Sequence, residues 1–505
     1  MAARAQQAYS DLLLRVREAG VLASCGSVLG WDESTYMPRN GSAWRGEQMG
    51  LLARLGHEMA TDPKVGDLLA VVESSSLLAD PVSDAAVNVR EIRRNYDRAV
   101  KLPATLVEAL AREATLAQGV WRDAKKASDF ALFRPNLERL VALLREKADA
   151  IGHGGCRYDA LLDEYEPAAT TAEITHVFAA LRAELVPLLA SIAASGKSPN
   201  REIVQRDYPV DRQKLFGEAA ASAIGFDFDA GRLDESAHPF CSGFGPGDCR
   251  ITTRYAPNHF NQAFFGILHE AGHALYEQGL PAEHAATPRG TYCSLGIHES
   301  QSRLWENQVG RCRPFWEHFF PRAKQTFSQA LRGVSLDEWM FAINDVQPSF
   351  IRVEADEVTY NLHIILRFEL EQAIISGDLA VADVPGAWNE KFSHLLGLKV
   401  PSDAMGCLQD IHWSFGGMGY FATYTLGNLY AAQFMETARQ EMPGLEDDFR
   451  AGHFARLKGW LNAKIHAPGQ VYRAGELCQH VTGKPLAHAP LMRYLRDKLS
   501  PLYGV

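Results

Sequence analysis

NHFNQAFFGILHEAGHALYEQGLP, residues 258 to 281, carries the start and stop signals of one long helix. Asn258 is a residue type that caps helix N-termini, and Gly279 followed by Pro281 marks an end. Between these signals, apolar residues recur at the three-and-four spacing that places them on one helix face: Phe264, Leu268, Ala271 and Leu275. The pattern predicts a helix whose apolar face is buried.

The same helical spacing of apolar residues extends over most of the chain. It recurs in LFRPNLERLVALLREKADAI at 132–151 and in NLHIILRFELEQAIISGD at 361–378. A short exception is DCRITTRY at 248–255, where β-branched and aromatic residues favour a strand. We find no repeat and no Gly/Ser-rich or Pro-rich linker. The chain is therefore predicted to be all-α, with a very small β element, and to form a single domain over residues 1–505.

Charge and composition narrow the classes of function. The chain has 505 residues and a formal net charge of −10, which argues against a general nucleic-acid or anionic-membrane binder. The first twenty residues form an amphipathic pattern without the apolar centre of a secretion signal. The apolar stretch 177–196 contains Arg182, Glu184 and Pro187, which argues against an uninterrupted membrane span. Eight scattered cysteines without a C-x-x-C pair are typical of reduced thiols, so we expect a cytoplasmic protein.

The helix at 258–281 also predicts a metal site. His269 and His273 lie four residues apart, so both imidazoles leave the helix on the same side. Two histidines on a rigid helix, with a glutamate directly after the first, form the H-E-x-x-H pattern of zinc peptidases. In that pattern Glu270 takes a proton from the metal-bound water. The alternative interpretation is a pair of surface histidines beside an ordinary glutamate.

A catalytic zinc site needs a third protein ligand and an open position. The segment GIHESQSRLWENQ at 296–308 offers Glu299, which follows His273 by 26 residues. That length allows a connecting loop and the antiparallel return of a second helix. His298 is the alternative, but adjacent helical residues point about 100° apart, so only one of the two faces the metal. We prefer Glu299 because two histidines and one glutamate are a ligand set of catalytic zinc.

With these residues in place, the chain resembles the carboxypeptidase Taq family of metallocarboxypeptidases. Five family motifs occur in the family's order: HPF at 238–240, DCRIT at 248–252, HESQ at 298–301, IRVEAD at 351–356 and GCLQDIHW at 406–413. LGWDESTYMP at 29–38 and HVTGKPL at 480–486 extend the resemblance over nearly the whole chain. The resemblance implies an elongated, almost all-helical subunit with two helical halves that flank a deep groove. It also implies a single metal at the groove floor, usually zinc, and a homodimer.

A carboxypeptidase must recognise the free carboxylate at the end of its peptide substrate, which calls for a fixed cation. Arg352 of IRVEAD and Arg250 of DCRIT are the candidates. Asp248 lies two residues before Arg250 on the same strand face, so the alternative for Arg250 is a pair with Asp248. His238 of HPF is predicted either to contact the substrate backbone or to be a core histidine.

The developing oxyanion needs a hydrogen-bond donor. His412, Tyr420 and Tyr424 are the candidates, in a segment whose glycines allow unusual backbone angles around His412 and Tyr420. For Tyr424 we favour the alternative of aromatic core packing. We also expect a carboxylate that fixes an imidazole tautomer, and Asp356 or Asp410 could serve.

The predicted function is release of single amino acids from peptides with a free C-terminus. Zinc held by His269, His273 and Glu299 would activate a water, and Glu270 would act as general base and then deliver the proton to the departing amino acid. Co²⁺ or Mn²⁺ could replace zinc, because ligand type alone does not select among these ions. The alternatives are a zinc endopeptidase, oligopeptidase or aminopeptidase, or a non-catalytic peptide-binding protein with structural zinc.

Overall fold

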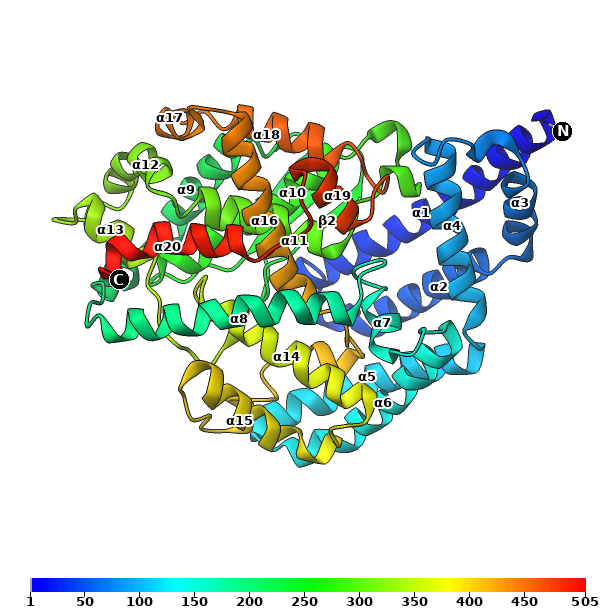
Figure 1. Cartoon of the computed structure of the whole chain (residues 1–505), viewed down its shortest axis with the longest axis horizontal. Coiled ribbons are helices and arrows are strands. Elements are labelled where there is room, and N and C mark those ends of the chain that lie inside the picture. The colour runs from blue at the N-terminus through cyan, green and yellow to red at the C-terminus, as the bar shows by residue number, and fades with distance from the viewer. Residues whose placement is uncertain (1) are drawn as a thin grey trace.

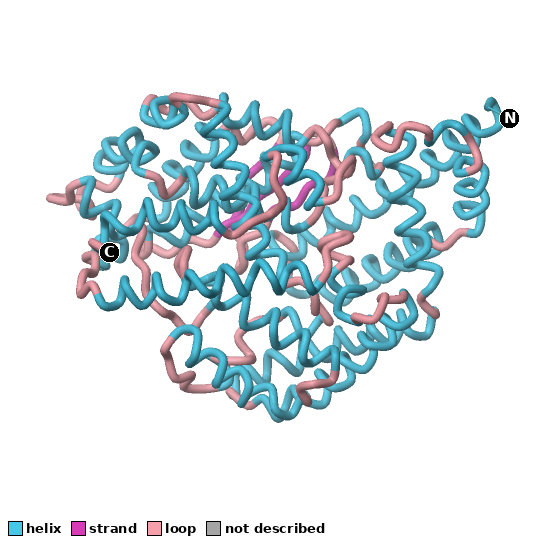
Figure 2. The backbone as a smooth tube through the Cα atoms, in the orientation of Figure 1, coloured by secondary structure: helices cyan, strands magenta, loops and turns pink. Residues whose placement is uncertain are grey.

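The computed structural model describes residues 2–505 and is mainly helical (Figures 1 and 2). Most of the backbone in Figure 2 is helical, and the strands lie together in one small region near the centre. The molecule is elongated, with the N-terminus at one end of the long axis and the C-terminus toward the other. The predicted all-α fold with a very small β element is confirmed.

The N-terminal helices form one end of the molecule, around a small core of their own. Leu12, Leu69 and Val72 are fully buried in this core. The first helix spans 34 residues and packs against the two helices that follow. The bounds are α1 (Ala2–Thr35), α2 (Ser42–Ala60), α3 (Pro63–Glu73) and α4 (Asp84–Lys101).

The remaining helices build the larger core, whose buried apolar residues extend from Ala117 to Tyr503. Before the sheet lie α5 (Ala104–Ala127), α6 (Phe130–Ile151), α7 (Arg157–Leu162), α8 (Thr171–Ala194) and α9 (Val210–Ile224). After it lie α10 (Phe260–Gly279), α11 (Leu295–Arg303), α12 (Arg313–Thr326), α13 (Leu336–Ile343), α14 (Thr359–Ser376) and α15 (Val384–Leu396). The chain ends with α16 (Ala422–Glu441), α17 (Leu445–Arg450), α18 (Ala455–Leu461), α19 (Ala474–Thr482) and α20 (Ala489–Tyr503). The single domain with two halves around a groove stays a prediction.

Within residues 2–505, α8 alone is long and apolar enough to cross a membrane by length and composition. In this fold it lies along the molecule and packs against α14 and α20 (Figure 1). Arg182 forms an ion pair with Glu369 at 2.6 Å, and Glu184 pairs with His488 at 2.8 Å. These polar partners from other parts of the chain agree with a helix packed against the rest of the protein.

The β element is a three-stranded sheet that packs against α10. Its strand order is β1 (Gly231–Glu235), β3 (Asp248–Thr253) and β2 (Cys241–Gly245), with β1 parallel and β2 antiparallel to β3. The predicted strand at 248–255 is confirmed as β3. The sequence did not reveal β1 and β2, because GRLDE and CSGFG are short and lack a regular apolar alternation.

The helix predicted at 258–281 is α10, and the structure corrects its start. His259, and not Asn258, is the N-cap, and its side chain accepts a hydrogen bond from the backbone N–H of Gln262. The helix ends at Gly279, as predicted. Buried residues lie on more than one face, because α9, α11 and strands β2 and β3 all pack around this helix. It is therefore a central helix of the fold.

Two glycines let three helices approach closely at the centre. A Cβ added to Gly272 of α10 would lie 2.6 Å from the backbone oxygen of Gln301 and 2.6 Å from the Cα of Ser302. A Cβ added to Gly427 of α16 would lie 2.5 Å from the Cγ of Glu299. Helix α11 is therefore packed directly between α10 and α16.

We expect Gly272→Ala to destabilise the protein, because its methyl group would collide with the backbone of α11, which cannot move aside as a side chain can. Overpacking of this kind costs about 1–3 kcal/mol. The matched control is Gly119→Ala, also inside a helix, where an added Cβ would meet nothing within 4 Å. Thermal unfolding should show a lower midpoint for Gly272→Ala, and an equal or higher one for Gly119→Ala because alanine favours helix. Equal midpoints for both variants would contradict the close approach.

Candidate metal centre

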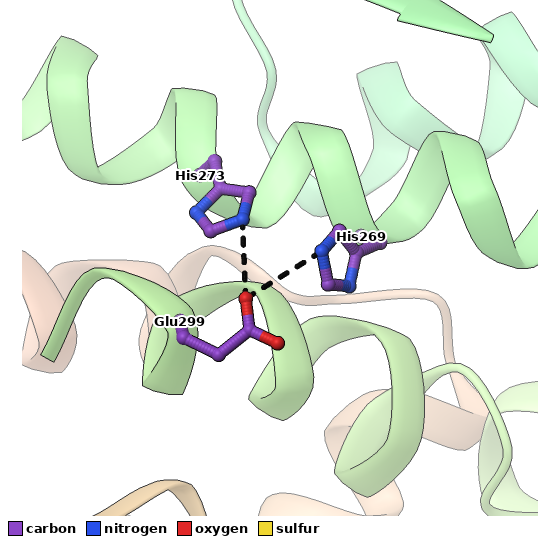
Figure 3. A group of neighbouring side chains, drawn as sticks. All are labelled: His269, His273 and Glu299. Carbon is purple, nitrogen blue, oxygen red and sulfur yellow. Dashed lines mark ion pairs between the residues drawn. The ribbon is translucent and has the colours of Figure 1, made fainter. Parts of the chain in front are cut away.

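Helices α10 and α11 bring His269, His273 and Glu299 together (Figure 3). The Oε2 atom of Glu299 lies 3.6 Å from Nε2 of His269 and 3.4 Å from Nε2 of His273. One ligand atom from each residue falls within 4.8 Å of the others. Nitrogen and oxygen donors in this number suit a catalytic metal ion with an open position. The predicted triad therefore fits a metal ion.

The carboxylate of Glu299 is held in place from its own helix. Nε of Arg303 donates to Oε1 of Glu299 at 2.7 Å, and the Ser302 hydroxyl donates to Oε2 at 3.0 Å. Burial by itself would raise the pKa of Glu299, but the charge of Arg303 and the neighbouring histidines lower it well below the usual value. Glu299 is therefore an ionised carboxylate, with Oε2 turned toward the histidines.

Glu306 is a further residue of the centre that the sequence analysis missed. It follows Glu299 by seven residues, on the same face, in a π-helical turn that continues α11 (Leu304–Val309). Its Oε2 atom lies 2.9 Å from Nδ1 of His269 and accepts from Nη1 of Arg303 at 2.9 Å. The spacing of Glu299, Arg303 and Glu306 could have predicted that Glu306 lies near the metal ligand Glu299, because positions i, i+4 and i+7 share a helix face.

The carboxylates predicted to orient an imidazole, Asp356 and Asp410, have other partners. Asp356 accepts from backbone N–H groups and from the hydroxyl of Thr359. Asp410 pairs with two arginines. The prediction for these two residues is wrong, since Glu306 contacts His269 instead.

Glu270 is buried beside the triad, with 6% of its surface exposed. Burial raises the pKa of its carboxyl group to about 7, since water no longer stabilises the ionised form. The charge of His269 opposes this rise, and the charges of Glu299 and Glu306 add to it. A carboxyl group with a pKa near neutrality is suited to taking and returning a proton.

Both candidate arginines already have carboxylate partners. Arg352 is 5% exposed and donates from Nε and Nη2 to Oδ1 of Asp410, at 2.9 and 2.7 Å. Arg367 pairs with the other oxygen of Asp410 at 2.6 Å. Arg250 forms two hydrogen bonds of 2.8 Å with Asp248, the alternative that the sequence suggested. Two guanidinium groups around one carboxylate leave a net positive charge near Arg352.

The three oxyanion candidates form one cluster. Nε2 of His412 lies 3.1 Å from the Tyr424 hydroxyl, and the rings of His412 and Tyr420 are 5.2 Å apart. Burial raises the pKa of Tyr420 to about 12, and the charge of Glu299 adds to the rise. Burial also lowers the pKa of His412 to about 3, so the imidazole is neutral. His238, by contrast, has an exposed side chain.

Comparisons with known proteins identify the family of this chain. A model of the carboxypeptidase Taq (M32) metallopeptidase family matches residues 11–499. The chain belongs to this family. It is 49% identical to thermostable carboxypeptidase 1 of Thermus thermophilus, over 99% of both chains. It is 36% identical to carboxypeptidase 1 of Bacillus subtilis, over 99% of this chain and 98% of that protein.

The fold comparison gives the same result. The crystal structure of the M32 carboxypeptidase from Deinococcus radiodurans R1 superposes with a TM-score of 0.96 and 41% identity, over 99% of this chain and 100% of that chain. A carboxypeptidase releases the C-terminal amino acid of a peptide. The predicted activity, a metallocarboxypeptidase, is confirmed, and peptides are its substrate class.

We expect Glu299→Ala to lower metal occupancy sharply, because it removes one of three protein donors and the only anionic one. Elemental analysis of the purified variant checks this. The control is Glu283→Ala, which removes an exposed glutamate just beyond the end of α10. Full occupancy of the Glu299 variant would mean that another residue completes the site.

Proposed function

We propose that His269, His273 and Glu299 hold a catalytic Zn²⁺ ion, with Co²⁺ or Mn²⁺ as possible replacements. The support is a compact set of two nitrogen donors and one oxygen donor. Charge supports it as well, because Glu270, Glu299 and Glu306 bring three carboxyl groups to the buried centre, and the pKa values of Glu299 and Glu306 are lowered well below the usual value. A cation is favoured beside these ionised carboxylates. Elemental analysis of protein purified without added metal identifies the ion.

In this proposal Glu270 moves the proton of the reaction. When bound, the metal ion polarises the peptide carbonyl and lowers the pKa of a water molecule. The carboxylate of Glu270 accepts a proton from the attacking water and delivers it to the nitrogen of the departing amino acid. The raised pKa of Glu270, about 7, supports both transfers, because neither protonation state is strongly favoured near neutral pH.

We propose that a tyrosine of the cluster around His412 stabilises the oxyanion. Tyr420 has a pKa of about 12, so its hydroxyl keeps its proton and can donate a hydrogen bond. The neutral imidazole of His412 contacts Tyr424 and can orient that hydroxyl. Comparing Tyr420→Phe with Tyr424→Phe would identify the donor, since the variant that lacks it loses kcat with little change in KM.

We expect Glu270→Gln to keep the metal and to lose nearly all turnover, because the amide preserves the shape of the side chain and cannot accept the proton. Metal content and kcat are measured on the same preparation. Glu283→Gln is the matched control, as it removes an exposed negative charge close to the same helix. Near wild-type turnover of the metal-loaded Glu270 variant would exclude the general-base role.

We propose that Arg352 binds the C-terminal carboxylate of the substrate. Its support is the positive charge that Arg352 and Arg367 keep after sharing Asp410. The position of Arg352 beside the metal centre also supports it. The Tyr360 hydroxyl accepts from Arg352 at 3.0 Å. The ring centroid of Tyr360 lies 4.4 Å from the guanidinium carbon of Arg303, whose side chain holds Glu299. Arg250 and the exposed His238 are the remaining candidates for substrate contact.

The Arg352 assignment predicts a loss that depends on the substrate's end group. For a peptide with a free carboxylate, Arg352→Ala should lower kcat/KM by about thirty-fold to several thousand-fold, or about 2–5 kcal/mol. Arg352→Lys should restore only part of the activity, because lysine lacks the planar fork. The C-terminal amide should be a poor substrate for wild type and hardly worse for the variant. Equal losses on both substrates would make Arg352 structural, and Arg250→Ala, tested in parallel, would then become the candidate.

We also propose a homodimer, formed through the N-terminal helices. Large apolar side chains lie exposed at seven-residue spacing on α1 (Leu14, Val21 and Val28) and on α2 (Trp44 and Leu51). Their exposed fractions range from 36% to 70%, and large apolar side chains gathered on exposed helix faces mark interaction sites. Light scattering of wild type and Val21→Glu tests this, and a wild-type monomer would exclude it. The cytoplasmic location stays a prediction, which cell fractionation tests.

A further inference from the structure

The second ring nitrogen of His273 faces another histidine. While Nε2 of His273 points to Glu299, its Nδ1 lies 2.6 Å from Nδ1 of His298. Two imidazole nitrogens at this distance share one proton, since one must donate and the other accept. His298, considered in the sequence as an alternative ligand, therefore contacts the ligand His273 on the side away from the metal centre.

Glu277 decides which nitrogen donates. Its Oε1 atom lies 2.8 Å from Nε2 of His298, and a carboxylate oxygen accepts a hydrogen bond from a ring N–H. In its neutral form His298 then carries its proton on Nε2, which leaves Nδ1 as the acceptor. His273 in turn must carry its proton on Nδ1, so the lone pair of its Nε2 is free to bind a metal ion. The relay from Glu277 through His298 to His273 imposes the tautomer that a ligand needs.

Three elements hold this relay in place. Glu277 lies one turn after His273 on α10, and His298 comes from α11. The rings of Tyr276 and Tyr292 flank His298, with centroids 5.2 and 4.8 Å from its own. Strand β2 closes the far end, because a Cβ on Gly243 would lie 2.6 Å from Oε2 of Glu277. The imidazole of His298 therefore has little freedom to turn away.

The two histidine ligands differ in how their second ring nitrogen, Nδ1, is held. His269 contacts the carboxylate of Glu306 directly through Nδ1. The Nδ1 atom of His273 reaches a carboxylate only through a second imidazole. Outer partners of this kind fix the orientation of metal-bound histidines, and their loss typically costs about 10–100-fold in metal affinity.

We propose that His298 and Glu277 are positioning residues that fix the tautomer and orientation of His273, so that metal affinity depends on both. Neither residue touches the ion. The inference rests on the proposed metal site of His269, His273 and Glu299. Loss of metal in Glu299→Ala tests that site, whereas variants of His298 and Glu277 test only the relay.

Two matched variants test the roles of the two ring nitrogens of His298 separately. The Oδ1 atom of His298→Asn can take the place of Nδ1 and accept from His273. In His298→Gln the terminal amide takes the place of Nε2, which keeps a partner for Glu277 and leaves His273 without its acceptor. Zn²⁺ affinity is measured by competition with a chelator on the metal-free variants. We expect His298→Gln to bind Zn²⁺ about 10–100-fold more weakly than wild type and His298→Asn to keep most of the affinity.

The visible absorption spectrum of the Co²⁺-loaded proteins gives a second readout, since it reports the ligand geometry directly. It should match wild type in His298→Asn and differ in His298→Gln. Circular dichroism and unfolding midpoints of the metal-free proteins show whether the variants keep the fold. Equal losses of affinity in both variants, or unchanged affinity in His298→Gln, would overturn the proposal.

A double-mutant cycle tests whether Glu277 acts through His298. Glu277→Ala, which removes the acceptor for Nε2 of His298, should weaken Zn²⁺ binding in the wild-type protein and have no further effect on His298→Asn, which has lost the link to Glu277. Additive effects would mean that Glu277 acts on the site independently, and the relay would be wrong. If a His298 variant does not fold, Glu277→Ala alone still decides, because unchanged Zn²⁺ affinity without an acceptor at this position would exclude the relay.

Discussion

The close crossing of α10 and α11 is the constraint on which the metal centre depends. At Gly272 the two helices approach so closely that no side chain fits between them, and at Gly427 helix α16 presses on α11 from the other side. This packing brings Oε2 of Glu299 within 3.4–3.6 Å of both histidines. Because helices are stiff, a small displacement of α11 would separate the donors.

The crossing also concentrates charge in a buried volume. Glu299 and Glu306 are both ionised, and Arg303 bridges them with hydrogen bonds to each. Arg311 lies 3.6 Å from the other oxygen of Glu306 and adds a second guanidinium. Buried ionised carboxylates are costly unless they are paired, so the packing that holds these groups also favours a cation beside them. Metal affinity and the local packing of this family member are therefore linked.

The sequence predicted best those features that are set by residues close together in the chain. The end of α10, the strand at 248–253 and the spacing of His269 and His273 follow from short-range periodicity and from capping residues. It failed where local signals were weak, as in the short strands β1 and β2, and it misplaced the N-cap by one residue. His259 accepts from the backbone N–H of Gln262 at 3.3 Å, and the sequence did not reveal this cap because histidine is not among the preferred N-cap residues.

The sequence by itself determined the helical fold, the histidine pair with its adjacent Glu270, and Glu299 as the candidate third donor. The fold and the histidine pair follow from the 3.6-residue period of a helix, which any single segment displays. The choice of Glu299 follows from the donor set that catalytic zinc needs. Only the tertiary structure decided that Glu306 contacts His269, that His298 and Glu277 reach His273, and that Arg352 shares Asp410 with Arg367. Each of these contacts depends on how elements separated in sequence cross one another, and a linear pattern carries no information about crossing angles or distances.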